Sequence, residues 1–230
     1  ITYSYKPSLA GINKLIENGI PIIFCSAKTR AEQEVYRSKL GNFHPFIVEN
    51  GGATFIPQAY FPFPFPYHRR VGELLAIELG TPYSEVKQLL DGIRREGDFH
   101  FKCFGDMSAE EIARVSGLDV ESAKLAKQRE YDETVIFDTT EEEVAKVLGK
   151  IKQVGLSWAY GGRFCDVMGD NDKGKAVRIL IDLYCKMWGE VNTIGIGDSF
   201  NDLPMLSVVD IPILVQKRDN SWESIDLPHL

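Results

Sequence analysis

Two aspartates, Asp198 and Asp202, stand four residues apart in the stretch GIGDSFND, directly after the apolar run VNTIGIG. Apolar runs of this length are typical of buried strands in parallel sheets. Open α/β sheets bind their ligands beyond the carboxyl ends of such strands. Carboxylates are oxygen ligands that suit Mg²⁺, but aspartate is also a common cap of short helices and turns. A metal site and a pair of caps are both open on these residues alone.

Two further polar residues stand at similar places. Ser26 ends the apolar run IPIIFC just before a predicted helix, and Lys173 begins the strongly periodic helix that follows GDND. A hydroxyl beside the free N–H groups of a helix start can bind phosphate. A lysine at the positive end of a helix dipole is relieved by a bound anion. An ordinary cap at Ser26 or Thr29 and a solvated lysine are the alternatives. Combined with an acidic metal site, these residue types suit phosphoryl transfer.

The elements that must position these residues follow from the hydrophobic pattern. Strands and helices alternate over residues 9–56 and again from 173, which predicts an α/β core with parallel strands. Between these parts lie one-sided strand patterns, the first at 74–79, separated by whole helices with capping signals. This texture predicts an α+β module inserted into the core. The Phe-Pro alternation at 61–70 fits neither a central strand nor a helix and is interpreted as a packed crossing between the two. We expect a core of 1–66 and 169–230 and an inserted domain of 67–168.

Composition narrows the class of protein. The net charge of −7 argues against binding to nucleic acid or to an anionic membrane. The four cysteines are widely spaced and suit the reducing cytoplasm better than a disulfide framework. No apolar stretch approaches the length of about 20 residues that a membrane span requires.

The ordered set of Ser26, Lys173 and GDSFND resembles motifs two, three and four of the phosphatases of the haloacid dehalogenase (HAD) superfamily. The inserted module resembles the C2-type cap that some of these enzymes carry between motifs two and three. Several stretches look like the subfamily that hydrolyses mannosyl-3-phosphoglycerate, and they are CSAKTRAEQEVYR, VENGGATFIP, REYDET, GGRFCDVMGDNDKGKA and GIGDSFNDLPML. The resemblance covers essentially the whole chain and implies a HAD-like Rossmannoid three-layer core with an inserted α+β cap.

The resemblance also implies roles for individual residues. Ser26 and Lys173 would bind the transferring phosphoryl group, and Asp198 would ligate Mg²⁺, with Asn201 and Asp202 supporting that site. An arginine fork suits a carboxylate or phosphate, and a glutamate accepts hydrogen bonds from sugar hydroxyls. The implied contacts to a small phosphorylated sugar-glycerate substrate come from Lys28, Thr29, Arg30, Asn50, Arg129, Glu130, Gly162, Arg163 and Phe164.

One motif of the superfamily has no counterpart in these 230 residues. Motif one, DxDGT, supplies the aspartate nucleophile that becomes an aspartyl-phosphate and the aspartate that acts as general acid and base. We therefore expect a fragment of a complete enzyme, with its core sheet divided at the middle and no phosphatase activity of its own. The alternatives are a catalytically dead sugar-phosphate-binding protein, a phosphomutase, and a phosphatase of another sugar phosphate such as glucosyl-3-phosphoglycerate.

Overall fold

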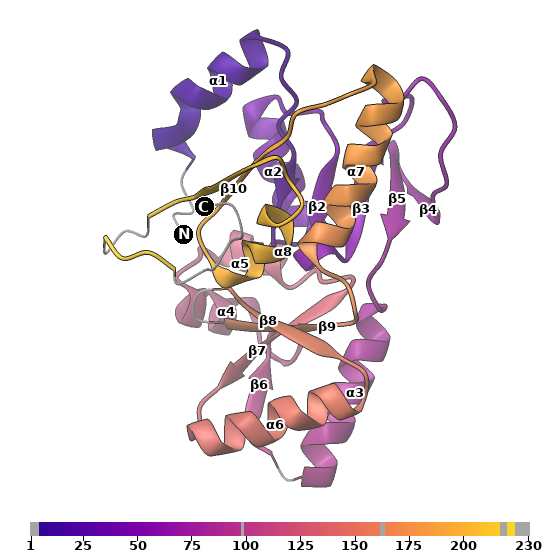
Figure 1. Ribbon diagram of the computed structural model, residues 1–230. Coiled ribbons are helices and arrows are strands. Elements are labelled where there is room, and N and C mark those ends of the chain that lie inside the picture. The colour runs from indigo at the N-terminus through magenta and orange to yellow at the C-terminus, as the bar shows by residue number, and fades with distance from the viewer. Residues whose placement is uncertain (1–4, 98, 162–163, 217–219, 224–230) are drawn as a thin grey trace.

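The computed structural model describes residues 5–97, 99–161, 164–216 and 220–223, and these form a core and a cap (Figure 1). The elements of the core are α1 (Leu9–Glu17), β1 (Phe24–Cys25), α2 (Arg30–Leu40), β2 (Phe46–Val48), β3 (Ala53–Pro57), β4 (Arg69–Val71), β5 (Leu74–Glu78), α7 (Lys173–Trp188), β10 (Ile194–Gly197), α8 (Leu203–Leu206) and β11 (Ile211–Leu214). The elements of the cap are α3 (Tyr83–Gly97), β6 (Phe101–Cys103), α4 (Ala109–Ser116), α5 (Val120–Ala126), β7 (Asp132–Phe137), α6 (Glu141–Gln153), β8 (Ser157–Gly161) and β9 (Phe164–Met168). Short 3-10 turns lie at Glu49–Gly51 and Phe200–Asp202. The described residues contain no helix that is long and apolar enough to cross a membrane.

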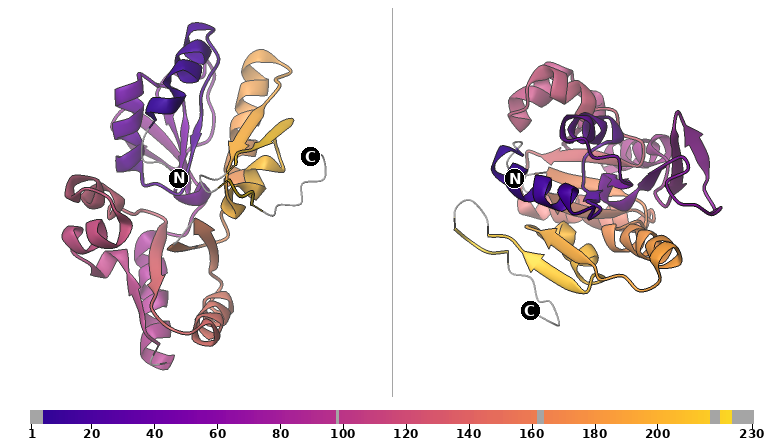
Figure 2. Two further views of the ribbon diagram at one scale, coloured as in Figure 1. Left: turned by 90° about the vertical axis from the view of Figure 1, so that its left-hand side faces the viewer. Right: turned by 90° about the horizontal axis from the view of Figure 1, so that it is seen from above.

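The core strands lie in two separate sheets. This agrees with the division of the core sheet that the sequence predicts. The larger sheet has the order β1-β2-β3-β5-β4, in which β1 and β2 are parallel, and β10 and β11 form a separate parallel pair. Figure 2 shows these two groups of strands on the same side of the cap. Ile194 and Ile196 on β10 are 62% and 61% exposed, so the expectation of a buried strand in this run is wrong for these two side chains. Helix α7 links the two sheets, because Ala176 and Leu180 pack with residues of β2 and β3, while Val177 packs against α8 and β11.

The cap is an antiparallel sheet in the order β6-β7-β9-β8. Side chains alternate between its two faces, as the period of two requires. Val135, Cys165 and Val167 pack against α3 and α6 in one cluster. Phe164 lies on the opposite face, in the cluster of α4 and α5. This alternation also carries Thr134 and Asp166 to that second face, which borders the core.

Two expectations about the inserted domain are wrong. The strand at 74–79 exists as β5, but it pairs with β3 and so belongs to the core sheet. The change from core to cap therefore falls between β5 and α3, rather than at residue 67. The Phe-Pro segment connects β3 to β4 within the core, and its Phe61 is 4% exposed and packs beside Tyr184 of α7. It fills a gap between helix and sheet because its prolines keep it extended and free of the ladder.

Candidate active site

A cavity of about 410 Å³ lies where the carboxyl ends of β1 and β10 meet the cap. The segment Cys25–Lys28 lines it after β1, the segment Gly197–Ser199 after β10, and Lys173 at the start of α7. The convergence follows from the parallel direction of these strands, which brings their carboxyl ends to one side of the core. The cavity brings together these residues predicted from the sequence: Ser26, Lys28, Arg129, Phe164, Lys173, Asp198, Asn201 and Asp202.

Lys173 and Asp202 form a buried ion pair in this cavity. The Lys173 Nζ atom lies 2.6 Å from Asp202 Oδ1, and the two side chains are 4% and 10% exposed. The other carboxylate oxygen of Asp202 accepts hydrogen bonds from the N–H groups of Asp198 at 3.0 Å and Ser199 at 3.3 Å. The alternative of a solvated Lys173 is therefore wrong. The helix-start lysine is relieved by an anion, and in this structure the anion is the carboxylate of Asp202.

The loop after β1 presents the hydroxyl of Ser26 to the cavity. The Ser26 N–H donates to the carbonyl of Ile47 at 3.2 Å, and its Oγ accepts from the N–H of Lys28 at 3.2 Å. The helix that follows is already capped, because Thr29 and Glu32 form a capping box at the start of α2. A phosphate beside Ser26 would therefore meet the loop 26–28 rather than the first turn of the helix.

Asp198 is the cavity residue best suited to a divalent cation. Its carboxylate lines the cavity and has no hydrogen bond or ion pair to any other residue in the described part of the chain. The amide oxygen of Asn201 accepts from Ser199 Oγ at 2.6 Å. Across the described ranges there is no group of three or more His, Cys, Asp or Glu side chains that could hold a metal. Because Mg²⁺ commonly uses only one or two protein carboxylates and keeps water and substrate phosphates as other ligands, Asp198 with Asn201 fits it.

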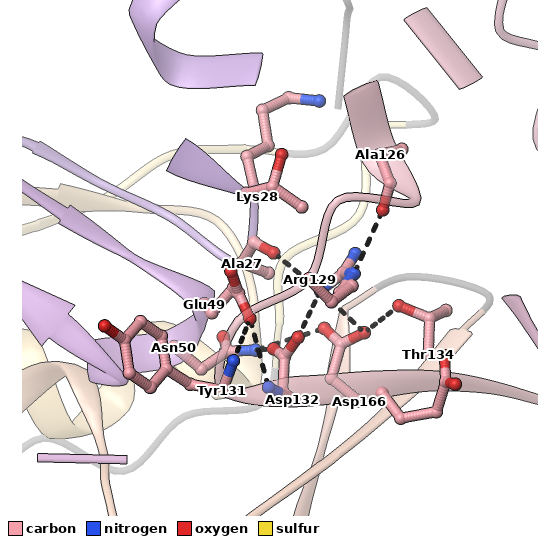
Figure 3. Close-up of polar contacts among 12 residues, drawn as sticks. Ala27, Lys28, Glu49, Asn50, Ala126, Arg129, Tyr131, Asp132, Thr134 and Asp166 are labelled. Atoms are coloured by element: carbon pink, nitrogen blue, oxygen red, sulfur yellow. Dashed lines mark hydrogen bonds and ion pairs between the residues drawn. The ribbon is translucent and has the colours of Figure 1, made fainter. Parts of the chain in front are cut away.

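On the cap side, Arg129 reaches across to the core (Figure 3). Its Nη1 donates to the carbonyl of Ala27 at 3.1 Å and to Asp132 at 2.5 Å, and lies 3.9 Å from Asp166. Burial alone would lower the pKa of Arg129, but Asp132 and Asp166 outweigh burial and raise the pKa well above its ordinary value. The hydroxyl of Thr134 donates to Asp166 at 2.8 Å. The cap therefore contributes a fixed positive charge and a buried carboxylate to the cavity.

Several predicted substrate-binding residues do not line this cavity. Arg30 Nε donates to Glu130 at 2.9 Å, and Glu130 also pairs with Arg69 on β4. Glu130 borders a second, smaller space of about 380 Å³. Thr29 is buried as the helix cap, and Asn50 is buried between the core and the cap carboxylates. Gly162 and Arg163 lie outside the described residues.

Glu49, Thr134 and Asp166 were missed by reasoning from the sequence. Asp166 lies in the predicted strand RFCDVM, two residues after Phe164, so the period of two places both on one face. Glu49 directly follows a buried strand, which is the same signal that singled out Asp198. Both residues are therefore marked by patterns that the sequence alone contains.

Comparison with known proteins agrees with this architecture. Residues 109–222 match the family model described as haloacid dehalogenase-like hydrolase. The glucosyl-3-phosphoglycerate/mannosyl-3-phosphoglycerate phosphatase of Methanococcoides burtonii is 48% identical over 222 residues, which cover 96% of this chain and 82% of that protein. The mannosyl-3-phosphoglycerate phosphatase of Pyrococcus furiosus is 40% identical, over 93% of this chain and 85% of that protein. The chain belongs to the haloacid dehalogenase-like hydrolase family.

The fold agrees with that assignment. A solved structure of a protein from Thermoplasma acidophilum superimposes with a TM-score of 0.61 at 18% identity, and the match covers 90% of this chain and 73% of that one. The predicted fold class, an α/β core with an inserted α+β cap, is confirmed.

Proposed function

We propose that this chain belongs to a phosphatase that hydrolyses mannosyl-3-phosphoglycerate and glucosyl-3-phosphoglycerate, releasing the corresponding glycosylglycerate and phosphate. The observation that carries the proposal is the cavity itself, which combines Ser26, the Lys173–Asp202 pair and the free carboxylate of Asp198. The relative that is 48% identical to this chain over 222 residues is named for both substrates. Both are therefore proposed, in place of the mannosyl compound alone.

Each cavity residue has a role that its position supports. Ser26 and Lys173 bind the transferring phosphoryl group, and Asp202 positions the lysine through their ion pair. Asp198, with Asn201 beside it, holds Mg²⁺, which when bound offsets the negative charge of the phosphate oxygens. Arg129 on the cap side suits the glycerate carboxylate, because its fork binds carboxylates in a fixed orientation. These assignments give the described residues the tasks of binding and orienting the substrate.

The test is phosphate release from each of the two substrates, with and without Mg²⁺. The 230-residue chain and the protein expressed from its complete reading frame are assayed side by side. Ser26→Ala is expected to lower kcat/KM by about 10- to 100-fold, since it removes a hydrogen bond to a charged group. Ser38→Ala, on the exposed side of α2, is the matched control and should leave kcat/KM unchanged. Absence of phosphate release from both substrates by both proteins would overturn the proposal.

A second candidate is a sugar-phosphate-binding protein without catalysis. The observation that favours it is that the positions of Ser26, Lys173 and Arg129 around the cavity support binding and orienting an anionic ligand. Titration calorimetry with the two glycosyl-3-phosphoglycerates distinguishes the candidates. Binding without phosphate release from either protein selects this second one.

We further propose the cytoplasm as the location and small molecules as the partners. The four cysteines are unpaired, which suits a reducing compartment. The net charge of −7 disfavours nucleic acid and anionic lipid as ligands.

A further inference from the structure

The turn after β2 has an unusual backbone. Glu49 and Asn50 have φ angles of 46° and 53°, and Gly51 follows with 89°. Positive φ is unfavourable for residues other than glycine, and it persists only where the surroundings hold it in place. At Gly51 a Cβ atom would lie 2.1 Å from the carbonyl oxygen of Asp172, so the chain at this turn is packed directly against the residue before Lys173.

The side chain of Glu49 points from the core into the cap and is fully buried (Figure 3). Its Oε2 atom accepts hydrogen bonds from three successive backbone N–H groups, those of Glu130 at 2.9 Å, Tyr131 at 2.6 Å and Asp132 at 3.0 Å. This segment leads into the cap strand β7. Burial raises the pKa of Glu49, while Arg129 and the three N–H groups act in the opposite direction and favour the ionised carboxylate, whose hydrogen bonds are roughly twice as strong as neutral ones. Glu49 is therefore a strong link between the core and the cap.

The same turn contacts the loops that carry the cavity residues. The N–H of Glu49 donates to the carbonyl of Lys28, and the N–H of Asn50 donates to that of Ser26. The Asn50 side chain accepts from Asn201 at 3.2 Å and donates to Asp166 on β9 at 3.1 Å. The turn thus touches the Ser26 loop, the Asn201 loop and the cap at once. Asn171, two residues before Lys173, donates to the carbonyls of both turn residues at 3.3–3.4 Å.

We propose that Glu49 is a positioning residue. Its carboxylate holds the start of β7 against the turn after β2. This turn aligns the Ser26 loop, the start of α7 at Lys173 and the loop of Asp198 and Asn201. The part of this inference that concerns catalysis rests on the proposed function. The part that concerns the attachment of the cap rests only on the contacts. Asn50, which the resemblance places among the substrate-binding residues, acts in the same turn as a link between Asn201 and the cap. Neither residue needs to touch the substrate.

Hydrogen exchange at the amides of Glu130, Tyr131 and Asp132 tests the attachment directly. These amides should be protected in the unmodified protein. In Glu49→Gln, which keeps the size of the side chain and removes its charge, they should exchange about tenfold faster or more. The matched control is Glu133→Gln, since Glu133 is an equally buried glutamate whose partners Tyr83 and Gly105 both lie in the cap. Glu133→Gln should change the exchange rates of these three amides by no more than about threefold. On a logarithmic scale, this is less than half of the change expected for Glu49→Gln.

Two results would overturn the inference. One is rapid exchange of the three amides in the unmodified protein, which needs no variant to fold. The other is equal exchange in Glu49→Gln and in the control. Uniform protection with a selective loss in Glu49→Gln supports it.

Kinetics provide the second arm. Glu49→Gln should raise KM for the glycosyl-3-phosphoglycerates more than it lowers kcat. The variant weakens the attachment of the cap side of the cavity, whereas Ser26 and Lys173 on the core side are unchanged. Glu49→Asp, which retains the charge, should recover part of the loss. A purely structural role would instead lower the yield of folded enzyme and leave KM unchanged, which would overturn the catalytic part. No turnover by the unmodified enzyme would refute the proposed function and leave the exchange result to decide the attachment.

Discussion

Separating the buried partners Lys173 and Asp202 should cost stability, and by different amounts for the two single changes. In Asp202→Asn the ammonium of Lys173 loses its charged partner while its side chain remains 4% exposed. Removing one member of a buried ion pair costs about 3–5 kcal/mol. In Lys173→Met the carboxylate of Asp202 keeps hydrogen bonds from the N–H groups of Asp198 and Ser199 and from the Ser199 hydroxyl. The cost there should be smaller, about 1–3 kcal/mol.

The double variant distinguishes this pair from two independent contributions. Because both partners are gone, the combined loss should fall short of the sum by about 1–3 kcal/mol, the coupling expected for residues in direct contact. The free energy of unfolding is measured by urea denaturation for the four proteins of the cycle. Lys146 and Glu142, an exposed pair 2.7 Å apart on α6, form the control cycle and should show a coupling of at most about 0.5 kcal/mol. Additive losses at Lys173 and Asp202, with coupling below about 0.5 kcal/mol, would refute the buried pair.

Three further predictions follow from the same structure. Asp198→Asn should weaken Mg²⁺ binding about tenfold or more, because it removes the free carboxylate of the cavity. Calorimetric titration with the metal alone measures this affinity. The midpoint of urea unfolding should change little. Gly51→Ala should destabilise the fold by more than the about 1–2 kcal/mol of left-handed strain, since its Cβ would lie 2.1 Å from the Asp172 carbonyl, whereas Gly72→Ala, with positive φ but open space, should cost only the strain. Burial raises the pKa of Glu133, the hydrogen bond from Tyr83 being the largest opposing cause. The folded state thus binds this proton more tightly, so stability relative to Glu133→Gln should increase as pH falls through the raised folded pKa toward the unfolded value near 4.5; a difference independent of pH between 7.5 and 4.5 would contradict it.

The cavity loops are the part of the site that local sequence could predict. Ser26, Lys173 and Asp198 each follow or precede a strongly apolar segment, and parallel strands bring such loops to one edge. The signal needs no knowledge of distant partners, because the position of each residue at the end of its own element already fixes its side of the sheet. The cap residue Glu130 and its core partner Arg30 lacked this advantage. In the sequence, Glu130 is next to Arg129 and Arg30 is two residues after Lys28, and both of those neighbours line the cavity. Glu130 and Arg30 are suited to a sugar or a carboxylate, yet they form an ion pair with each other at 2.9 Å.

The boundary between the core and the cap was predicted wrongly for a related reason. Leu74–Glu78 is a short, mostly apolar segment of the kind that forms strands, as the cap strands also are, and its side chains are buried or half-buried. The pattern predicts that a strand exists, but not which neighbour it pairs with. Pairing with β3 is decided by the hairpin with β4 and by the way the Phe-Pro segment packs Phe61 onto α7. The packing of Phe61 beside Tyr184 of α7 joins residues more than a hundred positions apart, so the local pattern contains no information about that contact.

The same limit explains why the roles of charged residues were harder to predict than their locations. Lys173 finds its anion 29 residues away, and the carboxylate of Glu49 finds the N–H of Glu130 81 residues away. In both cases a buried charge is tolerated because a partner arrives from a different element. A lysine at a helix start or a glutamate after a strand signals only that some partner is needed. Where that partner is a side chain or backbone of the protein, as here, the residue organises the site; where it is left open, as at Asp198, the residue remains available for a ligand.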